Sequence, residues 1–267
     1  MSEVKRNWTA VILSGQRPGP DRLADYFGQE LKALVEIAGE AMLTRVVRTL
    51  HAAPEVGRII VLSQVPDRLR VAVEAGGGAQ LIESGAGISA SINAIAGTDQ
   101  APWPLLVTTA DHPLLTPQMV AEFLASGTAA DLSIAMVERQ TMLAVFPEAQ
   151  RTWLKFRDGH WSGANLFALS NDRTSAALTL WAEAEQDRKV AWKLFLHFGP
   201  WLALRAITRT IGLSDALKAV GQRLGISINL VAMSDPVAAI DVDKPADHDL
   251  ASSIIAARAK ADATANG

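Results

Sequence analysis

The feature that most constrains the fold of this chain is a regular alternation of short apolar runs and amphipathic segments over its first half. The run Ala10 to Leu13 is rich in β-branched residues and ends in small residues, which is typical of a buried strand that feeds a loop. The predicted strands are 10–13, 58–62, 80–83 and 105–109, and the predicted helices are 41–51, a segment starting at 66, and 88–95. This alternation predicts right-handed βαβ units, and therefore an α/β fold with three layers, in which helices flank a mainly parallel, twisted sheet.

The second half of the chain loses this regularity. The segments that favour strands there are 132–137, 142–146, 153–157, 161–169, 226–231 and a short one ending at Ile240. We expect them to form an antiparallel extension of the sheet. Residues 172–224 are predicted to be a helical insertion or appendage, 245–260 a closing helix, and 261–267 a disordered tail. The simplest interpretation is a single domain over residues 1–267.

Composition excludes several classes of function. The chain has 267 residues, 49% hydrophobic and 20% charged, which is ordinary for a globular protein with a substantial core. Its formal net charge of -3 gives no support for a nucleic-acid binder. The absence of cysteine excludes disulfides and thiolate nucleophiles. Because the N-terminus lacks the apolar core of a signal peptide and no apolar run reaches ~20 residues, we expect a cytoplasmic protein with no membrane span.

The loop after the first strand is the expected phosphate site. Ligands of open α/β sheets bind beyond the carboxyl ends of strands, and Arg17, Arg22 and Lys32 would supply positive charge there. The loop matches neither G-x-G-x-x-G nor G-x-x-x-x-G-K-[ST], which counts against a dinucleotide dehydrogenase and a P-loop NTPase. Taken alone, Lys32 reads more simply as a solvated lysine.

Two carboxylates follow predicted strand ends. Asp111 comes after the strand 105–109, and Asp243 comes after the apolar residues 238–240. Magnesium is commonly held by one or two carboxylates together with substrate phosphates, so both residues are candidate ligands. Aspartate is equally common at turns and helix N-caps, and this alternative has equal weight. His112 could approach a phosphate beside Asp111.

The stretch Trp192 to Leu204 is unusually apolar and aromatic. We interpret it first as core, with a homodimer interface as the second interpretation and a hydrophobic acceptor pocket as the third. His197 within it fits a core histidine, and no histidine cluster indicates a transition-metal site.

The order of several short motifs carries a family resemblance. In chain order they are Leu13-Ser14-Gly15-Gln16-Arg17, Lys32-Ala33-Leu34, Gly39-Glu40-Ala41-Met42-Leu43, Gly87-Ile88-Ser89-Ala90-Ser91-Ile92, Asp111-His112-Pro113-Leu114 and Asp241-Val242-Asp243-Lys244-Pro245-Ala246-Asp247. They resemble the L-A-G-G-x-G-x-R, K-x-L, G-x-P-M-[LI], G-x-x-x-S-[IV], D-x-P-[LF] and D-[IV]-D-[TK]-P-x-D segments of nucleotidyltransferases of the glycosyltransferase-A-like fold. Within that fold the chain is most similar to the MobA-like, molybdenum-cofactor guanylyltransferase-like family. The chain departs from the family pattern in its loop, where Gln16 replaces a glycine and prolines 18 and 20 offer no N–H donor.

The resemblance implies a nucleotide-diphospho-sugar transferase-like fold and a nucleotidyl transfer reaction. An NTP would give its NMP to a small phosphorylated acceptor and release pyrophosphate, with Mg²⁺ or Mn²⁺ as the cofactor. The resemblance implies catalytic roles for Arg17, Lys32 and Asp111, and metal ligation by Asp111 and Asp243. The nucleotide-binding residues that it implies are Leu13, Ser14, Gly15, Gln16, Gly19, Lys32, Glu83, Ser89 and Ser91.

The acceptor segment and the reaction class both have alternatives. The run Trp161 to Phe167 resembles a G-x-N-[IL]-F segment that contacts the acceptor in sugar-phosphate nucleotidyltransferases, which implies acceptor binding by Gly163 and Asn165. The alternative is a central strand with a bulge at the glycine. Two rival functions also remain: a nucleotide-sugar glycosyltransferase on the same fold, and a nucleotide-binding regulatory protein with weak or no catalysis.

Overall fold

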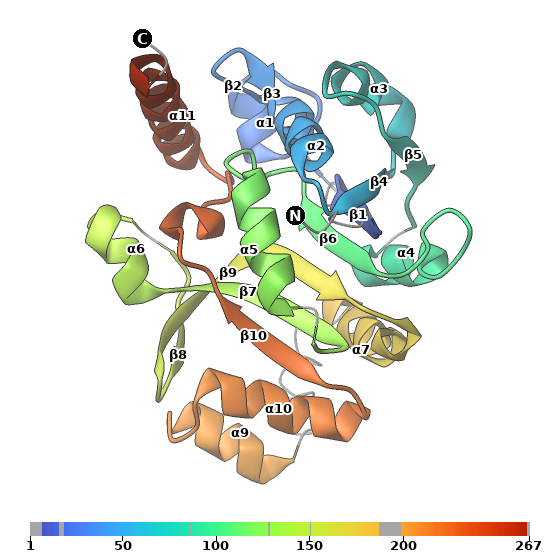
Figure 1. Cartoon of the computed structure of the whole chain (residues 1–267), viewed down its shortest axis with the longest axis vertical. Helices are drawn as coiled ribbons and strands as arrows, with labels where there is room; N and C mark the ends of the chain where they lie inside the picture. The colour runs from blue at the N-terminus through green and yellow to red at the C-terminus, as the bar shows by residue number, and fades with distance from the viewer. Residues whose placement is uncertain are drawn as a thin grey trace.

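Strand β1 (Trp8–Leu13) lies in the interior of the main sheet and pairs in parallel with a strand on each side (Figure 1). The computed structural model describes residues 7–15, 19–85, 87–127, 129–149, 151–186 and 199–265. The main sheet has eight strands in the order β10-β7-β9-β6-β1-β4-β5, with β8 paired to β9. The other main-sheet strands are β4 (Val56–Ser63), β5 (Gln80–Glu83), β6 (Leu105–Thr109), β7 (Leu132–Glu138), β8 (Leu154–Phe156), β9 (Gly159–Leu169) and β10 (Ile228–Ala232). A two-stranded sheet joins β2 (Glu36–Ile37) to β3 (Glu40–Ala41).

Helices cover both faces of the sheet because the strands are apolar on both sides. Ala10 and Ile12 of β1 belong to one buried cluster, and Val11 between them belongs to another. The first cluster includes side chains of α2 (Met42–Ala52), α3 (Pro66–Ala75) and α5 (Pro117–Gly127). The second includes side chains of α4 (Ile88–Ile95) and α7 (Ser175–Gln186). The expected three-layer α/β fold is therefore confirmed (Figure 1).

The antiparallel extension is also confirmed. Strand β9 runs antiparallel to both β6 and β7, and β8 joins β9 in a hairpin whose turn contains Asp158. Strand β10 then returns parallel to β7. The remaining helices are α1 (Arg22–Tyr26), α6 (Arg139–Val145), α9 (Pro200–Ile207), α10 (Leu213–Leu224) and α11 (Pro245–Ala265), with 3-10 turns η1 (Lys32–Leu34), η2 (Asp172–Thr174) and η3 (Pro236–Ala239).

Two predicted strands are wrong. Residues 142–146 fall largely in helix α6, in which Met142 is buried. A run of five residues is too short for its period to separate strand from helix. The residues before Ile240 form η3, because Asp235 accepts a hydrogen bond from Val237 N at 2.9 Å and starts a turn. Helix α11 continues to Ala265, beyond residue 260, where we expected the helix to end.

The stretch from Trp192 to Leu204 is only partly described. Residues 192–198, with His197, lie outside the described residues. On α9, Trp201 is 69% exposed and Leu204 is 49% exposed, while Ala203 is buried. The core interpretation is wrong for Trp201 and Leu204, because this short helix buries only one face. Among the described helices, none is both long and apolar enough to cross a membrane.

Asp131 joins three segments at the start of β7. Its carboxylate accepts hydrogen bonds from the backbone N–H of Ser227 at 2.7 Å, from the hydroxyl of Ser227 at 2.8 Å, and from Asn171 Nδ2 at 2.8 Å. These bonds, with the charge of Arg173, lower the pKa of Asp131 from 3.8 to about 2, although burial opposes the shift. The charged carboxylate therefore holds the start of β10 and the end of β9 against β7.

Replacing Asp131 with asparagine is expected to lower the free energy of unfolding by about 1–3 kcal/mol at pH 7, because three donors lose an ionised acceptor. Urea denaturation measures this difference. Since the folded-state pKa is depressed, the contribution is present above pH 3.8 and is lost as the pH falls toward about 2, so the two proteins should converge there. Asp215→Asn, at an exposed ion pair, is the matched control. Equal stability of the Asp131 variant and the wild type at pH 7 would contradict this account.

Candidate active site

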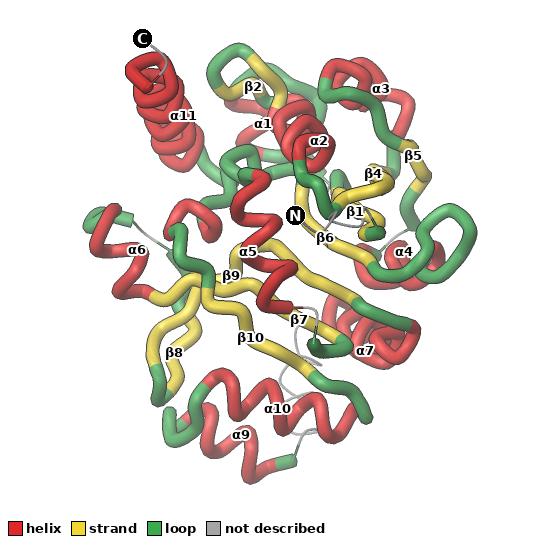
Figure 2. Tube along the Cα trace, in the orientation of Figure 1, coloured by secondary structure: helices red, strands yellow, loops and turns green. Residues whose placement is uncertain are grey.

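Three predicted site residues meet at the carboxyl end of the central strands. Lys32 in η1 donates hydrogen bonds from Nζ to Asp111 Oδ2 at 2.5 Å and to Asp243 Oδ1. Asp111 follows β6 and Asp243 precedes α11, and both are outside helices and strands. Figure 2 shows the segment that leads into α11 as a loop. The Lys32 side chain is 19% exposed, so its reading as a solvated lysine is wrong. The structure places one cation between the two carboxylates.

Backbone hydrogen bonds hold this arrangement together. Ala110 N donates to Leu13 O at 3.0 Å, which joins the ends of β6 and β1. Val242 N donates to Asp111 O at 3.0 Å, which brings the segment before α11 against the end of β6. Asp247 accepts bonds from the N–H groups of residues 243 and 244, so Asp247, and not Asp243, caps this end of α11. The side chain of Asp243 therefore remains available for Lys32.

The electrostatics of the cluster favour a charged lysine. Burial alone would lower the pKa of Lys32, but the charges of Asp111 and Asp243, together with their hydrogen bonds, raise it above its ordinary value. Oδ1 of Asp111 is buried and accepts no hydrogen bond within the described part of the chain. This oxygen is an acceptor that a further cation could use.

Two small crevices meet beside this cluster. The first, of about 40 Å³, is lined by Lys32, Asp111 and the residues 13–15 at the end of β1. The second, of about 20 Å³, shares Leu13 and Gly15 with the first and continues to Ser84, Gly85 and Ser91. Together the crevices form a path from the Lys32 cluster to the N-terminus of α4.

The polar groups along this path differ in whether they already have a hydrogen-bond partner in the protein. The N–H of Ser14 donates to Leu62 O at 2.9 Å, so this N–H is not available to a phosphate. The hydroxyls of Ser14 and Ser84 are buried and, among the described residues, have no hydrogen-bond partner. Gly15 permits the close approach of Gln64, whose Nε2 lies 3.2 Å from the position that a Cβ at residue 15 would take. An alanine at residue 15 would therefore narrow the path.

A third cavity of about 320 Å³ is bordered by Asp243. Its lining residues include Arg151, Gly163, Asn165 and Asp241. The β7–β9 register shifts between Ile134 and Met136, opposite residues 163–167, so the bulge predicted for this strand is present. The bulge gives Asn165 a φ of 49° and brings its side chain into the cavity wall. A bulged central strand is thus confirmed, but the bulge lies at residues 164–166 and not at Gly163, which pairs with Met136. The bulge is compatible with a role in the cavity.

His112 does not supply positive charge at this site. Its side chain is 1% exposed, and burial lowers its pKa to about 4 in spite of the nearby Asp111 and Asp241. The imidazole is therefore neutral at pH 7.

The remaining predicted residues fall into two groups. Gln16 and Arg17 lie outside the described residues. Gly19, Glu83 and Ser89 are described, but they line none of the three cavities above. Sequence reasoning missed Arg151, and it noted Asp241 only as a neighbour of Asp243. Asp241 could have been found from the pair of acidic residues, Asp241 and Asp243, that lie two positions apart before Pro245. This spacing places one carboxylate on each side of the loop.

The described residues contain no group of three or more His, Cys, Asp or Glu side chains that could hold a metal alone. The pair Asp111 and Asp243 still fits a magnesium site completed by substrate phosphates, because it offers oxygen ligands and one buried, unpartnered oxygen.

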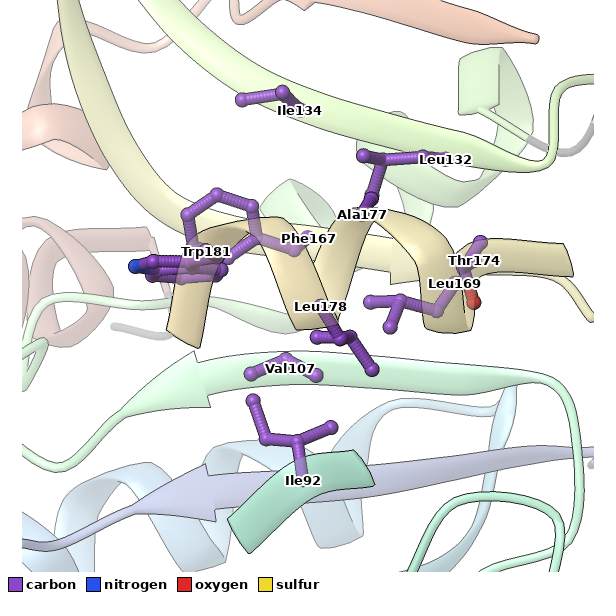
Figure 3. A pocket seen from close by; sticks show the side chains of 10 residues that line it. All are labelled: Ile92, Val107, Leu132, Ile134, Phe167, Leu169, Thr174, Ala177, Leu178 and Trp181. Atoms are coloured by element: carbon purple, nitrogen blue, oxygen red, sulfur yellow. The ribbon is translucent and has the colours of Figure 1, made fainter. Parts of the chain in front are cut away.

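A separate apolar cavity of about 90 Å³ lies between α7, α4 and the sheet (Figure 3). Trp181 and Phe167 lie side by side there with ring centroids 5.3 Å apart, and Ile92, Val107 and Leu178 are among the other residues that line the cavity. It offers little polar chemistry, so the polar cavities around Asp243 and Lys32 are the better candidate site.

Comparison with known families agrees with this geometry. A family model described as the MobA-like NTP transferase domain matches residues 10–195. The chain belongs to this family. The resemblance that the motifs indicated is therefore confirmed, and its matched region contains Lys32, Asp111 and Asn165. A search of curated proteins finds no match.

Solved structures show the same fold. A hypothetical transferase from Thermus thermophilus superposes on this family member with a TM-score of 0.76 and 25% identity, over 90% of this chain and 99% of that chain. A 4-diphosphocytidyl-2C-methyl-D-erythritol synthase gives a TM-score of 0.58 at 16% identity, over 94% and 99%. CMP:2-keto-3-deoxy-manno-octonic acid synthetase, complexed with CTP, gives 0.58 at 16% identity, over 94% and 100%. The expected nucleotide-diphospho-sugar transferase-like fold is confirmed.

Proposed function

We propose that this protein transfers an NMP from an NTP to a small phosphorylated acceptor and releases pyrophosphate. The observation that carries the proposal is the meeting of Lys32, Asp111 and Asp243 at the carboxyl end of β1 and β6. Membership of an NTP transferase family and the CTP-bound structural neighbour support the same class of reaction. Such a transfer needs alignment and neutralisation of phosphate charge more than covalent help from the protein.

In this proposal the nucleotide lies along the two small crevices. Its triphosphate would lie against residues 13–15 and Lys32, and its base would extend toward Ser84 and Gly85. The raised pKa of Lys32 keeps its ammonium charged, so Lys32 can stabilise charge that develops on the phosphate. The hydroxyls of Ser14 and Ser84, which have no partner within the described ranges, can donate to the nucleotide.

Asp111 and Asp243 would hold Mg²⁺ or Mn²⁺. When bound, the ion would neutralise phosphate charge and help to align the reacting groups. Lys32 now contacts both carboxylates, so it would exchange one or both of these contacts for phosphate oxygens when nucleotide and metal bind.

The acceptor would enter from the third cavity, which borders Asp243. Gly163 and Asn165 line this cavity, and Asn165 offers both a donor and an acceptor. In-line attack requires acceptor and leaving pyrophosphate on opposite sides of the reacting phosphorus, and separate cavities for the nucleotide and the acceptor leave room for both.

The test is to incubate the protein with Mg²⁺ and each of ATP, GTP, CTP and UTP, against a panel of phosphorylated acceptors, and to measure pyrophosphate. We expect one NTP to give acceptor-dependent pyrophosphate. Binding of an NTP with no pyrophosphate from any acceptor would favour a regulatory protein instead. Release of a nucleoside diphosphate from a nucleotide sugar would favour a glycosyltransferase.

A further inference from the structure

Helix α9 carries a stripe of large apolar side chains that are open to solvent. Trp201 is 69% exposed, Leu204 is 49% exposed and Ile207 is 57% exposed. These residues are three positions apart on one helix, so their side chains lie along one side of it. Ala203, on the other side, is buried. The helix therefore packs through its small residues and presents its large ones outward.

The stripe is a cluster and not a chance exposure. In the described part of the chain, no other helix or strand has more than one large apolar residue that is exposed. Single exposed apolar residues are normal on protein surfaces, whereas a group of them marks a surface that contacts something else.

The position of α9 in the fold holds this stripe at the surface. Helix α9 contacts α10, and α10 contacts β10, so α10 lies between α9 and the sheet; Figure 1 shows α9 at one end of the molecule. The segment after α9 is fixed to the β8–β9 hairpin, where Arg157 N donates to Ile211 O at 3.0 Å and Asp158 accepts from Leu213 N at 2.9 Å. Contacts along α9 and beyond its C-terminal end thus hold the stripe in place.

The charges beside the stripe are positive. Arg205 lies within α9, and Arg209 follows the helix and is exposed. Within the described part of the chain, neither arginine pairs with a carboxylate, and Arg205 donates only to the backbone oxygen of residue 210. Asp215 is the first acidic residue after α9, and it is paired with Arg157. Both arginines can therefore attract an external anion.

The sequence around α9 has the opposite charge from the chain as a whole. The chain has a formal net charge of -3. Between Asp187 and Asp215 there is no acidic residue, and the basic residues are Arg188, Lys189, Lys193, Arg205 and Arg209. Of these, only Arg205 and Arg209 are among the described residues. An anionic surface would attract the protein at this end and repel the rest, which would orient it.

An anionic lipid surface fits these features better than a second copy of the chain does. Tryptophan and aliphatic side chains enter the boundary between headgroups and acyl chains, and nearby arginines add attraction to anionic headgroups. In a symmetric dimer through this stripe, Arg205 and Arg209 of both copies would come together with no free carboxylate between them. That arrangement would oppose association.

We propose that α9 docks this protein on membranes that contain anionic lipids. Trp201, Leu204 and Ile207 enter the boundary between headgroups and acyl chains, while Arg205 and Arg209 lie at the level of the lipid phosphates. Docking is peripheral and reversible, because the stripe is short. It is separate from nucleotidyl transfer, since none of these residues lines the cavities beside Lys32 and Asp243.

Co-sedimentation of the full-length protein with vesicles tests this docking. One set of vesicles is phosphatidylcholine alone, and the other contains about 30% phosphatidylglycerol. We expect the protein to bind the anionic vesicles at least about tenfold more tightly than the neutral ones, and to be released as the salt concentration rises.

Two variants separate the apolar contribution from the electrostatic one. Trp201→Glu should weaken binding to anionic vesicles by at least about tenfold. Arg209→Asn should weaken it by about fivefold, and asparagine suits the φ of 56° at this position. Val71→Glu, at an apolar residue of α3 that is 81% exposed, and Arg70→Gln on the same helix are the matched controls and should bind as the wild type does. Thermal melting checks that each variant folds, and Arg209→Asn carries the test if Trp201→Glu does not fold.

The outcomes distinguish this inference from its rival and from the proposed function. Equal binding to both kinds of vesicle, no binding to anionic vesicles, or binding that neither variant weakens would overturn it. Sedimentation velocity without vesicles tests the rival: a dimer that Trp201→Glu dissociates, in a protein that binds no vesicles, would assign the stripe to a second copy. Pyrophosphate release without vesicles should be the same in Trp201→Glu and the wild type, so vesicle binding and nucleotidyl transfer can each fail without the other.

Discussion

Asp111→Asn is expected to reduce nucleotidyl transfer by about 100-fold or more while the protein remains folded. The substitution keeps the size of the side chain but removes the charge that Lys32 and a bound cation would share. It also changes Oδ1, the buried oxygen without a partner, whose availability is the clearest sign of a ligand position. Loss of one electrostatic contact to a reacting phosphate typically costs about 10²–10³ in rate.

The measurement for Asp111→Asn is kcat/KM at saturating Mg²⁺, with the free energy of unfolding from urea denaturation. Because Lys32 retains Asp243, we expect the change in stability to stay within about 1 kcal/mol. Asp215→Asn is the matched control, since it neutralises an aspartate with an arginine partner on the surface. Wild-type kcat/KM in Asp111→Asn would remove Asp111 from the mechanism.

Lys32→Met should lower turnover about as much as Asp111→Asn does, and it should also lower stability in a way that Mg²⁺ offsets. Without the ammonium, Asp111 and Asp243 face each other as like charges, which we expect to cost roughly 1–2 kcal/mol. A divalent cation would replace the missing charge, so Mg²⁺ should raise the Tm of the variant more than that of the wild type. We also expect a fall of about 100-fold in kcat/KM for the NTP.

Thermal melting of the Lys32 variant with and without Mg²⁺ distinguishes a specific site from general salt effects. Lys218→Met is the matched control, because Lys218 is exposed on α10 and its loss leaves no facing carboxylates. Equal responses to Mg²⁺ in the wild type and both variants would contradict a cation site at Asp111 and Asp243.

The sequence predicts the regular part of the fold well, because the spacing of apolar residues along a strand or helix reflects which of its faces are buried. The strand 105–109 and the helix 88–95 have the predicted bounds, since each is apolar on the faces that the two clusters bury. The run 142–146 was too short for its period to separate strand from helix, and it is helical. Short segments at the edges of the sheet therefore depend on tertiary contacts that a single sequence does not display.

The candidate site was also only partly predictable from the sequence. Asp111 and Asp243 could be predicted because they follow strand-like runs within ordered motifs, and their meeting with Lys32 agrees with that prediction. Arg151 could not, because its partner Asp241 lies 90 positions away and nothing in its local sequence marks it. The positive φ of Asn165 likewise could not be predicted, because it arises where the register between β7 and β9 shifts. This shift is visible only once the two strands are paired.

The central claim is that this site moves an NMP onto a phosphorylated acceptor. The most direct measurement is ³¹P NMR of a reaction with the accepted NTP, Mg²⁺ and an acceptor that gives pyrophosphate in the panel. The account predicts that the α-phosphorus of the NTP appears in a new diphosphate linkage to the acceptor, with one pyrophosphate formed for each linkage and the signals absent in Asp111→Asn. Formation of orthophosphate or a nucleoside diphosphate, with the acceptor phosphate unchanged, would contradict it.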